Sequence, residues 1–227
     1  MVCFIHGNLY SRKRIDYKLK ENMSQKDFWN ERYSREEFIY GIAPNEYLKE
    51  KLQEIKPGKI LFPAEGEGRN AVYAAKMGWK PEAFDQSEVG KEKAISLAEE
   101  NQTDISYTIS DAENIEYPNN TFDALALIYA HFKGDRRREF HQKLATFLKP
   151  GGFLIIEGFS KFQEEYQKKY PRSGGPRNPE MLYDLEELKK DFENFEMKES
   201  TLTTITLNEG DHHKGQASVV RIFAVKK

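Results

Sequence analysis

The sequence predicts an α/β fold with five parallel strands in one sheet, helices on both faces of that sheet, and an antiparallel hairpin at the end. Short apolar runs alternate with helical segments over most of the chain, and this alternation is typical of a mostly parallel sheet. Two longer strand-like runs, 196–207 and 217–225, then flank the turn-rich segment 208–215. Strands joined by such a turn pair antiparallel, so a hairpin is expected to complete the sheet.

Each element has its own local signal. Phe28, Trp29 and Tyr33 lie on one side of a short first helix. Apolar runs predict parallel strands at 59–63, 80–84, 105–109, 122–128 and 153–158. Amphipathic segments predict helices at 44–55, 68–77, 87–101, 135–148 and 185–192. Proline and glycine after these segments stop them, as at Pro57-Gly58, and Ser87 is a good N-cap residue.

The length of 227 residues suits a single domain with one core. Residues 1–22 are polar and basic and show no clear apolar period, so they are expected to form a flexible extension. The domain is expected to span 23–227, with Met23 as an alternative start of translation.

Composition narrows the class of protein. No apolar run approaches the roughly 18 residues that span a bilayer, and the apolar start is too short for a signal peptide, which predicts a cytoplasmic protein with no membrane partner. The single cysteine, Cys3, allows neither an internal disulfide nor a cysteine-rich zinc site, and no metal is expected. A formal net charge of −2, with only short basic runs, argues against a nucleic-acid partner.

A glycine loop follows the first strand and begins the next helix. It reads Ala64-Glu65-Gly66-Glu67-Gly68-Arg69-Asn70-Ala71, and its two glycines allow a tight turn and close approach of the backbone to a ligand. The same letters fit the dinucleotide pattern GxGxxG/A, so the glycines alone leave the cofactor open.

Charge favours one cofactor over the other. A dinucleotide would place its pyrophosphate at this helix N-terminus, where Glu65 and Glu67 would repel it and one basic residue, Arg69, would not offset both acids. S-adenosylmethionine carries an ammonium and a sulfonium and no phosphate, so an acidic loop suits it. The alternative is that both glutamates merely face solvent.

Two further acids follow the next two strands. Asp85, at the end of the second strand, can accept hydrogen bonds from a ribose diol. Asp111 and Ala112 follow the third strand, where an acid or a backbone group can meet an adenine amino group, although an aspartate in an ordinary turn is the alternative. Together with the glycine loop, these positions predict an adenosine ligand.

A larger set of short motifs lies between about residue 26 and residue 225, at 28–33, 40–45, 65–72, 85–87, 131–132, 148–152 and 174–176. On these motifs the chain resembles the tellurite-resistance type of class I S-adenosylmethionine methyltransferase. The resemblance implies the Rossmann-like sheet of that class and S-adenosylmethionine as cofactor. The cofactor contacts expected in addition to the acids above are Gly66, Gly68, Asn70, Gln86 and Ala130.

The glycine loop departs from the Asp-x-Gly-Cys-Gly of many class I enzymes, and Glu65 is then the candidate for the methionine ammonium. The resemblance implies soft acceptors such as thiols, halides, or selenium and tellurium species, without naming one. Amino methylation of nucleic acid is disfavoured, because Ile128-Tyr129-Ala130-His131 stands where such enzymes carry an Asn/Asp-Pro-Pro-aromatic motif.

Aromatic residues are expected at the reacting methyl group. Trp29, Tyr33 and Tyr40 can face a sulfonium through cation–π attraction, worth about 0.5–2 kcal/mol, and Tyr33 is also a candidate catalytic residue. The alternative for Trp29, which is also a candidate acceptor contact, is packing of the first helix on the sheet.

The segment after the fourth strand lies at the edge of the sheet where α/β proteins bind ligands. His131 is a candidate for deprotonating the acceptor, with Phe132 beside it as an acceptor contact. A structural histidine bonded to the backbone is the alternative. His212 and His213 lie in the hairpin loop, and adjacent histidines point in different directions, so their role stays open.

Residues 166–179 could form a lid over the acceptor, with Arg172 and Arg177 holding an anionic group, or an ordinary surface loop. The leading hypothesis is a small-molecule methyltransferase, as a monomer or a homodimer. The alternatives are a nicotinamide-dependent oxidoreductase and a non-catalytic protein that binds an adenosyl ligand or confers resistance.

Overall fold

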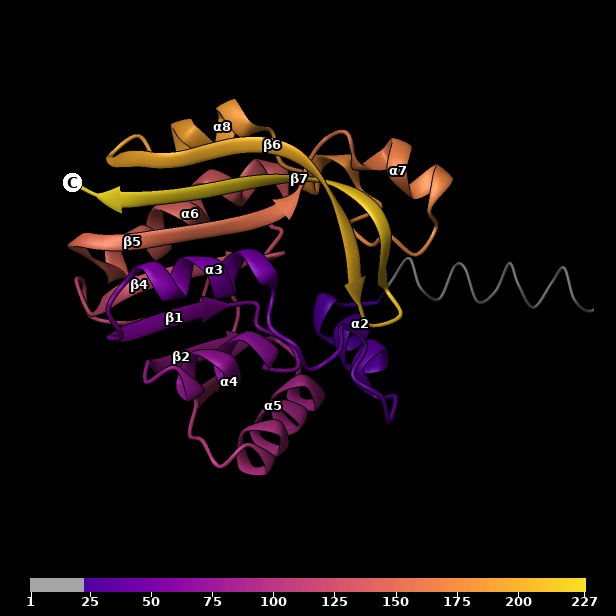
Figure 1. Ribbon diagram of the computed structural model, residues 1–227, viewed down its shortest axis with the longest axis horizontal. Coiled ribbons are helices and arrows are strands. Elements are labelled where there is room, and N and C mark those ends of the chain that lie inside the picture. The colour runs from indigo at the N-terminus through magenta and orange to yellow at the C-terminus, as the bar shows by residue number, and fades with distance from the viewer. Residues whose placement is uncertain (1–22) are drawn as a thin grey trace, which may run out of the picture.

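The computed structural model describes residues 23–227, and its strands form one twisted sheet (Figure 1). The predicted extension at 1–22 lies outside the described residues. The strand order is β3-β2-β1-β4-β5-β7-β6. The strands are β1 (Lys59–Pro63), β2 (Lys80–Asp85), β3 (Ser106–Ile109), β4 (Phe122–Ile128), β5 (Leu148–Phe159), β6 (Phe195–Glu209) and β7 (His213–Lys226). β1 to β5 pair in parallel, and β7 pairs antiparallel with both β5 and β6, which confirms the predicted fold.

Helices cover both faces of the sheet (Figure 1). One face carries α3 (Glu46–Glu54), α4 (Arg69–Lys76) and α5 (Glu88–Glu100), and the other carries α6 (Gly134–Phe147) and α8 (Leu185–Asp191). α2 (Gln25–Tyr33), α7 (Gln163–Lys169) and the short 3-10 helix η1 (Pro179–Met181) lie toward the carboxyl ends of the strands. No helix within residues 23–227 is long and apolar enough to cross a bilayer.

The core has two layers because each central strand is buried on both sides. On β1, Leu61 packs with α6 and α8, whereas Ile60 and Phe62 pack with α3 and α4. On β7, Ile222 and Phe223 divide between the same two layers. Parallel strands covered on both faces read as continuous apolar runs, which is why the sequence located them well.

The hairpin turn is shorter than predicted. The sequence indicated a loop at 208–215, but only Gly210–His212 lies between β6 and β7. The turn-favouring residues on either side are paired in the ladder, as Asn208 with Lys214 and Leu207 with Gly215. The hairpin curves so that its tip lies near α2, at the carboxyl ends of the parallel strands (Figure 1).

Candidate active site

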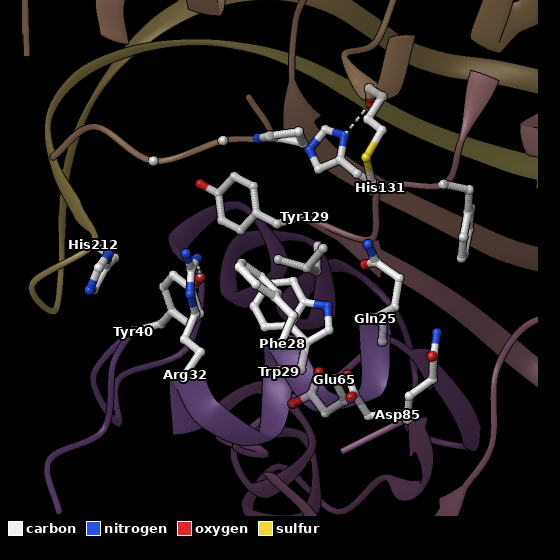
Figure 2. Close-up of a pocket in the computed structure, with 18 of the residues that line it drawn as sticks. Gln25, Phe28, Trp29, Arg32, Tyr40, Glu65, Asp85, Tyr129, His131 and His212 are labelled. Carbon is white, nitrogen blue, oxygen red and sulfur yellow. Dashed lines mark hydrogen bonds between the residues drawn. The ribbon is translucent and has the colours of Figure 1, made fainter. Parts of the chain in front are cut away.

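A cavity of about 500 Å³ lies at the carboxyl ends of the parallel strands, where ligands bind in open α/β sheets. Every parallel strand except β5 contributes residues directly after its last position, and β5 contributes its last residue, Phe159. α2, the segment 171–181 and the hairpin tip line the rest. Figure 2 shows Glu65 and Asp85 toward one end and Tyr129 and His131 toward the other, with Trp29 between them.

The two ends of the cavity differ in chemistry. Three acids among the described residues line it: Glu65 follows β1, Asp85 is the last residue of β2, and Asp111 follows β3. The opposite part is aromatic and basic, with lining residues Arg32, Tyr40, Tyr129, His131, Phe159, Arg177, His212 and His213. The acidic part is called here the nucleoside end, and the other part the acceptor end.

Glu65 caps helix α4 from the glycine loop. Its Oε1 accepts the backbone N–H groups of Asn70 and Ala71, each at 2.8 Å, at the first turn of the helix. The other oxygen has only a 3.5 Å contact with the Asn70 side-chain amide, while the residue lines the cavity. Burial raises the pKa of Glu65 to about 7, although Ala71 and Arg69 act to lower it. An added positive charge in the cavity would therefore favour its ionised form.

Glu67 plays a different part from the one predicted. It is 4% exposed and does not line the cavity. Its carboxylate pairs with Lys93 at 2.8 Å and accepts the backbone N–H of Ile39 at 2.9 Å. The expectation that this acid repels a pyrophosphate was therefore wrong, since its charge is neutralised. Glu65 instead disfavours a phosphate directly, because its carboxylate already occupies the helix N–H groups that a phosphate would need.

The loop glycines shape the site without lining it. Gly66 and Gly68 have φ of +62° and +84°. A Cβ on Gly66 would lie 2.5 Å from the Tyr33 hydroxyl, and one on Gly68 would lie 2.4 Å from the Cβ of Ala94. Both glycines let α2 and α5 pack directly on the loop, so their role is close approach.

Asp85 links β2 to the same loop. Its two oxygens accept the backbone N–H groups of Gly66, at 3.1 Å, and Ser87, at 2.9 Å. Burial raises its pKa to about 6. Gln86, Ser110, Asp111 and Ala112 line the cavity beside it, and Asp111 also accepts the Asn114 N–H at 2.8 Å. The predicted nucleoside contacts are thus brought together, except Gly66, Gly68 and Ala130, which lie behind the lining.

Helix α2 covers the centre of the cavity. Ser24 caps it, and Asn30 fixes it to α5 by accepting the Ser87 hydroxyl at 2.7 Å. Trp29 stacks on Tyr33 with ring centroids 5.4 Å apart, and both line the cavity. Burial and the nearby Asp85 raise the pKa of Tyr33 well above its ordinary value, so its hydroxyl keeps its proton and cannot serve as a base.

His131 is held by the backbone on both sides of its ring. Nδ1 lies 2.8 Å from the carbonyl oxygen of Met181, and Nε2 accepts the N–H of Phe159 at 3.1 Å. Burial lowers its pKa to about 4. The geometry corrects the expectation of a general base, because neither ring nitrogen has a lone pair left for an acceptor. Phe132 also lines the cavity, and its predicted contact with an acceptor stays a prediction.

The segment 166–179 is partly helical rather than a loop, because α7 extends through residue 169. Gln163 and Gln167 on α7 donate to the carbonyl oxygens of Gly174, Gly175 and Pro176, which fixes the Gly-Gly-Pro turn. Arg177 lines the cavity, and Arg172 instead pairs with Asp211 on the exterior.

Sequence reasoning missed several lining residues, namely Gln25, Phe28, Arg32, Tyr129, Phe159, Met181 and His213. Tyr129 could have been found, since it comes directly after β4 in the segment that contains His131. His213 could not, because it begins a strand 144 positions after Arg69 in sequence and reaches the cavity only through the curved hairpin. Within residues 23–227 there is no cluster of histidine, cysteine or acidic residues that could hold a metal ion.

Comparison with known proteins agrees with this geometry. Residues 60–152, from β1 into β5, match the methyltransferase domain family. The sheet order and the position of the cavity are likewise those of the class I S-adenosylmethionine-dependent methyltransferase fold, the class that the sequence motifs resemble. S-adenosylmethionine is the cofactor of that class.

Among particular proteins, the chain is 27% identical over 128 residues to the ubiquinone/menaquinone biosynthesis C-methyltransferase UbiE of Hydrogenovibrio crunogenus. That alignment covers 49% of this chain and 46% of UbiE, so it spans about half of each protein.

Two solved structures share the fold. One, described under the conversion of a disulfide bond into a thioacetal group during echinomycin biosynthesis, has a TM-score of 0.73, with 17% identity over 90% of this chain and 92% of that chain. The other, TehB from Haemophilus influenzae, has a TM-score of 0.66, with 18% identity over 89% of this chain and 67% of that chain. At 17% and 18% identity, these two matches show a shared fold.

Proposed function

We propose that the protein methylates a small, soft nucleophile, such as a thiol, a halide or a selenium or tellurium species, with S-adenosylmethionine as the methyl donor. The proposal depends most on one observation, the carboxylate of Glu65 bound to the first N–H groups of α4. A dinucleotide needs those donors for its pyrophosphate, and a cationic amino-acid nucleoside does not. The remaining Glu65 oxygen is suited to an ammonium group.

The nucleoside end supplies groups for the rest of the cofactor. Asp85 would accept the ribose hydroxyls, since an ionised carboxylate has about four lone-pair sites and its backbone bonds do not use all of them. Asp111 and Ala112 would meet the adenine, and Trp29, Tyr33 and Tyr40 would present their rings to the sulfonium. When bound, S-adenosylmethionine supplies a methyl group on a sulfonium that is already a good leaving group.

The protein's own contribution would then be alignment and exclusion of water. α2 covers the cavity, and the acceptor end is walled by stacked rings, such as Tyr129 on Phe159 with centroids 4.7 Å apart. Aromatic walls suit a polarisable acceptor, and a cavity of about 500 Å³ leaves room for a small one beside a cofactor. Among residues 23–227 no acid lines the acceptor end, which favours an anionic nucleophile there.

Calorimetry with S-adenosylmethionine, S-adenosylhomocysteine and NAD tests the cofactor. We expect both sulfur nucleosides to bind and NAD not to bind. Glu65→Gln is expected to weaken S-adenosylmethionine about tenfold, with the exposed Glu46→Gln as a control that leaves it unchanged. Binding of NAD without binding of S-adenosylmethionine would overturn the proposal.

Transfer of a labelled methyl group to an alkanethiol, a thiophenol, iodide, selenite and tellurite tests the reaction. Turnover of at least one member of this panel is expected. Tight binding of the cofactor with no turnover on the whole panel would favour a non-catalytic protein that binds an adenosyl ligand.

A further inference from the structure

His213 and Glu209 face each other across the tip of the hairpin. His213 Nδ1 lies 3.1 Å from Glu209 Oε2. The same oxygen accepts an N–H of Arg69 at 2.9 Å, and Asn45 donates to Oε1 at 3.4 Å. Burial opposes ionisation, but the charge of Arg69 and the bond from His213 hold the pKa of Glu209 at about 2. Because Glu209 stays ionised and can only accept, the proton of a neutral His213 lies on Nδ1.

The other nitrogen of His213 is free. Nε2 has no hydrogen-bond partner among residues 23–227, and the side chain lines the acceptor end of the cavity. Gly174, with φ of +80°, lies beside this edge of the ring, and a Cβ there would come within 2.9 Å of Nε2. The glycine therefore keeps side-chain atoms away from the lone pair.

Aromatic neighbours fix the plane of the His213 ring. Its centroid lies 4.5 Å from that of Tyr40, 4.6 Å from that of Tyr129 and 5.2 Å from that of Phe159. The ring is therefore oriented by packing as well as by the carboxylate. The titratable or charged groups around it are Glu209, Arg69, His212, Tyr40, Tyr129 and His131.

The other two histidines at the cavity lack this arrangement. His131 uses both of its nitrogens on backbone groups. His212 has no hydrogen-bonded carboxylate in the part of the chain that the structure describes. A carboxylate on one nitrogen and a lone pair on the other is the arrangement of a general base in catalysis. Of the three, His213 alone has it.

We propose that His213 Nε2 is the general base that takes the proton of a protic acceptor such as a thiol, with Glu209 as the positioning residue that fixes the tautomer. The inference rests on the proposed methyl transfer. The S–H bond of the thiol breaks, its proton forms an N–H bond at Nε2, and its electron pair forms the new S–CH₃ bond. The pair of the cofactor's broken S–CH₃ bond stays on its own sulfur, and the imidazolium later releases its proton to water.

Two acceptors of similar size distinguish a general-base role of His213 from a structural role. Benzyl mercaptan is mostly protonated at pH 8, whereas 4-nitrothiophenol is mostly ionised and needs no base. His213→Asn keeps an amide next to Glu209 and removes Nε2. We expect it to lower kcat for benzyl mercaptan about 100-fold and to change kcat for 4-nitrothiophenol less than about threefold. His212→Asn is the matched control and is expected to change neither.

An equal loss on both thiols, or no loss on either, would overturn the inference. A measurement that needs no turnover tests the inference independently of the proposed function. Nitrogen-15 histidine spectra of the free protein at pH 8 should show His213 neutral with its proton on Nδ1, and Glu209→Gln should give a mixture of tautomers. A protonated Nε2 at that pH would contradict the inference even if methyl transfer is found. Failure to bind S-adenosylmethionine would instead sink the proposed function.

Discussion

Tyr129 and Glu157 are joined twice across neighbouring strands. The backbone N–H of Tyr129 donates to the Glu157 carbonyl oxygen at 2.7 Å, and its hydroxyl donates to Oε1 of the same residue at 2.8 Å. Tyr129 has φ of +54°, a left-handed conformation that residues other than glycine seldom adopt. Glu157 therefore holds a strained aromatic residue of the cavity wall at both ends.

Replacement of this carboxylate should destabilise the protein. Glu157 is 1% exposed and also accepts the Asn45 side-chain amide and the Arg221 guanidinium, each at 2.6 Å. Glu157→Gln puts an N–H₂ group against one of these donors and leaves Arg221 without a counter-charge. A loss of about 3 kcal/mol in the free energy of unfolding is expected, measured by urea denaturation. Glu46→Gln, whose pair with Lys49 is exposed, should leave the midpoint unchanged, and an unchanged midpoint for Glu157→Gln would contradict the prediction.

The affinity for S-adenosylmethionine should rise with pH. In the free protein burial raises the pKa of Glu65 to about 7, and a cationic ligand would favour the ionised form. Below about pH 7 binding must release this proton, so the dissociation constant should increase by up to about tenfold for each unit that the pH falls. Titration calorimetry in two buffers of different ionisation enthalpy measures the released proton. Glu65→Gln should remove the release, and its persistence would assign the proton to another group.

The raised pKa of Glu65 has the opposite consequence for the stability of the ligand-free protein, which should fall as pH rises. The folded-state pKa of Glu65 lies above its ordinary value of 4.5, so the folded protein binds the proton more tightly than the unfolded chain does. This group therefore lowers the free energy of unfolding as pH rises from about 4.5 to about 7. Without ligand at pH 8, Glu65→Gln should raise Tm while it weakens cofactor binding. A lower Tm would show that the favourable interaction of the Glu65 charge with the N-terminus of α4 outweighs the cost of burying that charge.

Two glycines with similar backbone angles should respond differently to alanine. Gly68 and Gly151 have φ of +84° and +77°, but a Cβ on Gly68 would lie 2.4 Å from the Cβ of Ala94 and one on Gly151 meets nothing within 4 Å. Gly151→Ala should cost about 1 kcal/mol from backbone strain. Gly68→Ala should cost roughly 2 kcal/mol more, because α4 and α5 must separate. Equal losses in chemical denaturation would show that the helices can move apart freely.

The two tryptophans should report differently on ligand binding. Trp29 lines the cavity, whereas Trp79 is 4% exposed and packs in the core layer below α3 and α4. S-adenosylmethionine should change the emission of Trp29, so Trp29→Phe should abolish the change and Trp79→Phe should retain it. Trp29→Ala should weaken binding about fivefold to thirtyfold through loss of cation–π attraction. A response that survives in Trp29→Phe would place the ligand elsewhere.

Local patterns in the sequence were enough to predict the sheet and the nucleoside end. The strands are continuous apolar runs, and the carboxyl ends of parallel strands meet at one edge, so Glu65, Asp85 and Asp111 had to be neighbours. The seven-residue α7 was not predicted, because its buried face carries Gln163 and Gln167 instead of apolar residues.

The acceptor end could not be predicted in the same way. It depends on contacts between residues far apart in sequence, such as Arg69 with Glu209 and Asn45 with Glu157. The hairpin tip that carries His213 reaches the cavity only because β6 and β7 extend beyond the other strands and bend. The part of Glu67 was misjudged for a similar reason, since its partner Lys93 lies on a different helix.

β7, the last strand in sequence among residues 23–227, occupies an interior place in the sheet, between β5 and β6. During synthesis the edge of β5, with Leu154, Ile155 and Ile156, is therefore open until β7 has left the ribosome. A nascent chain at that stage already contains the nucleoside end but exposes the unpaired edge of β5 to other chains. Ribosome stalling or premature termination before β7 is translated would thus produce aggregation-prone polypeptides rather than merely inactive ones.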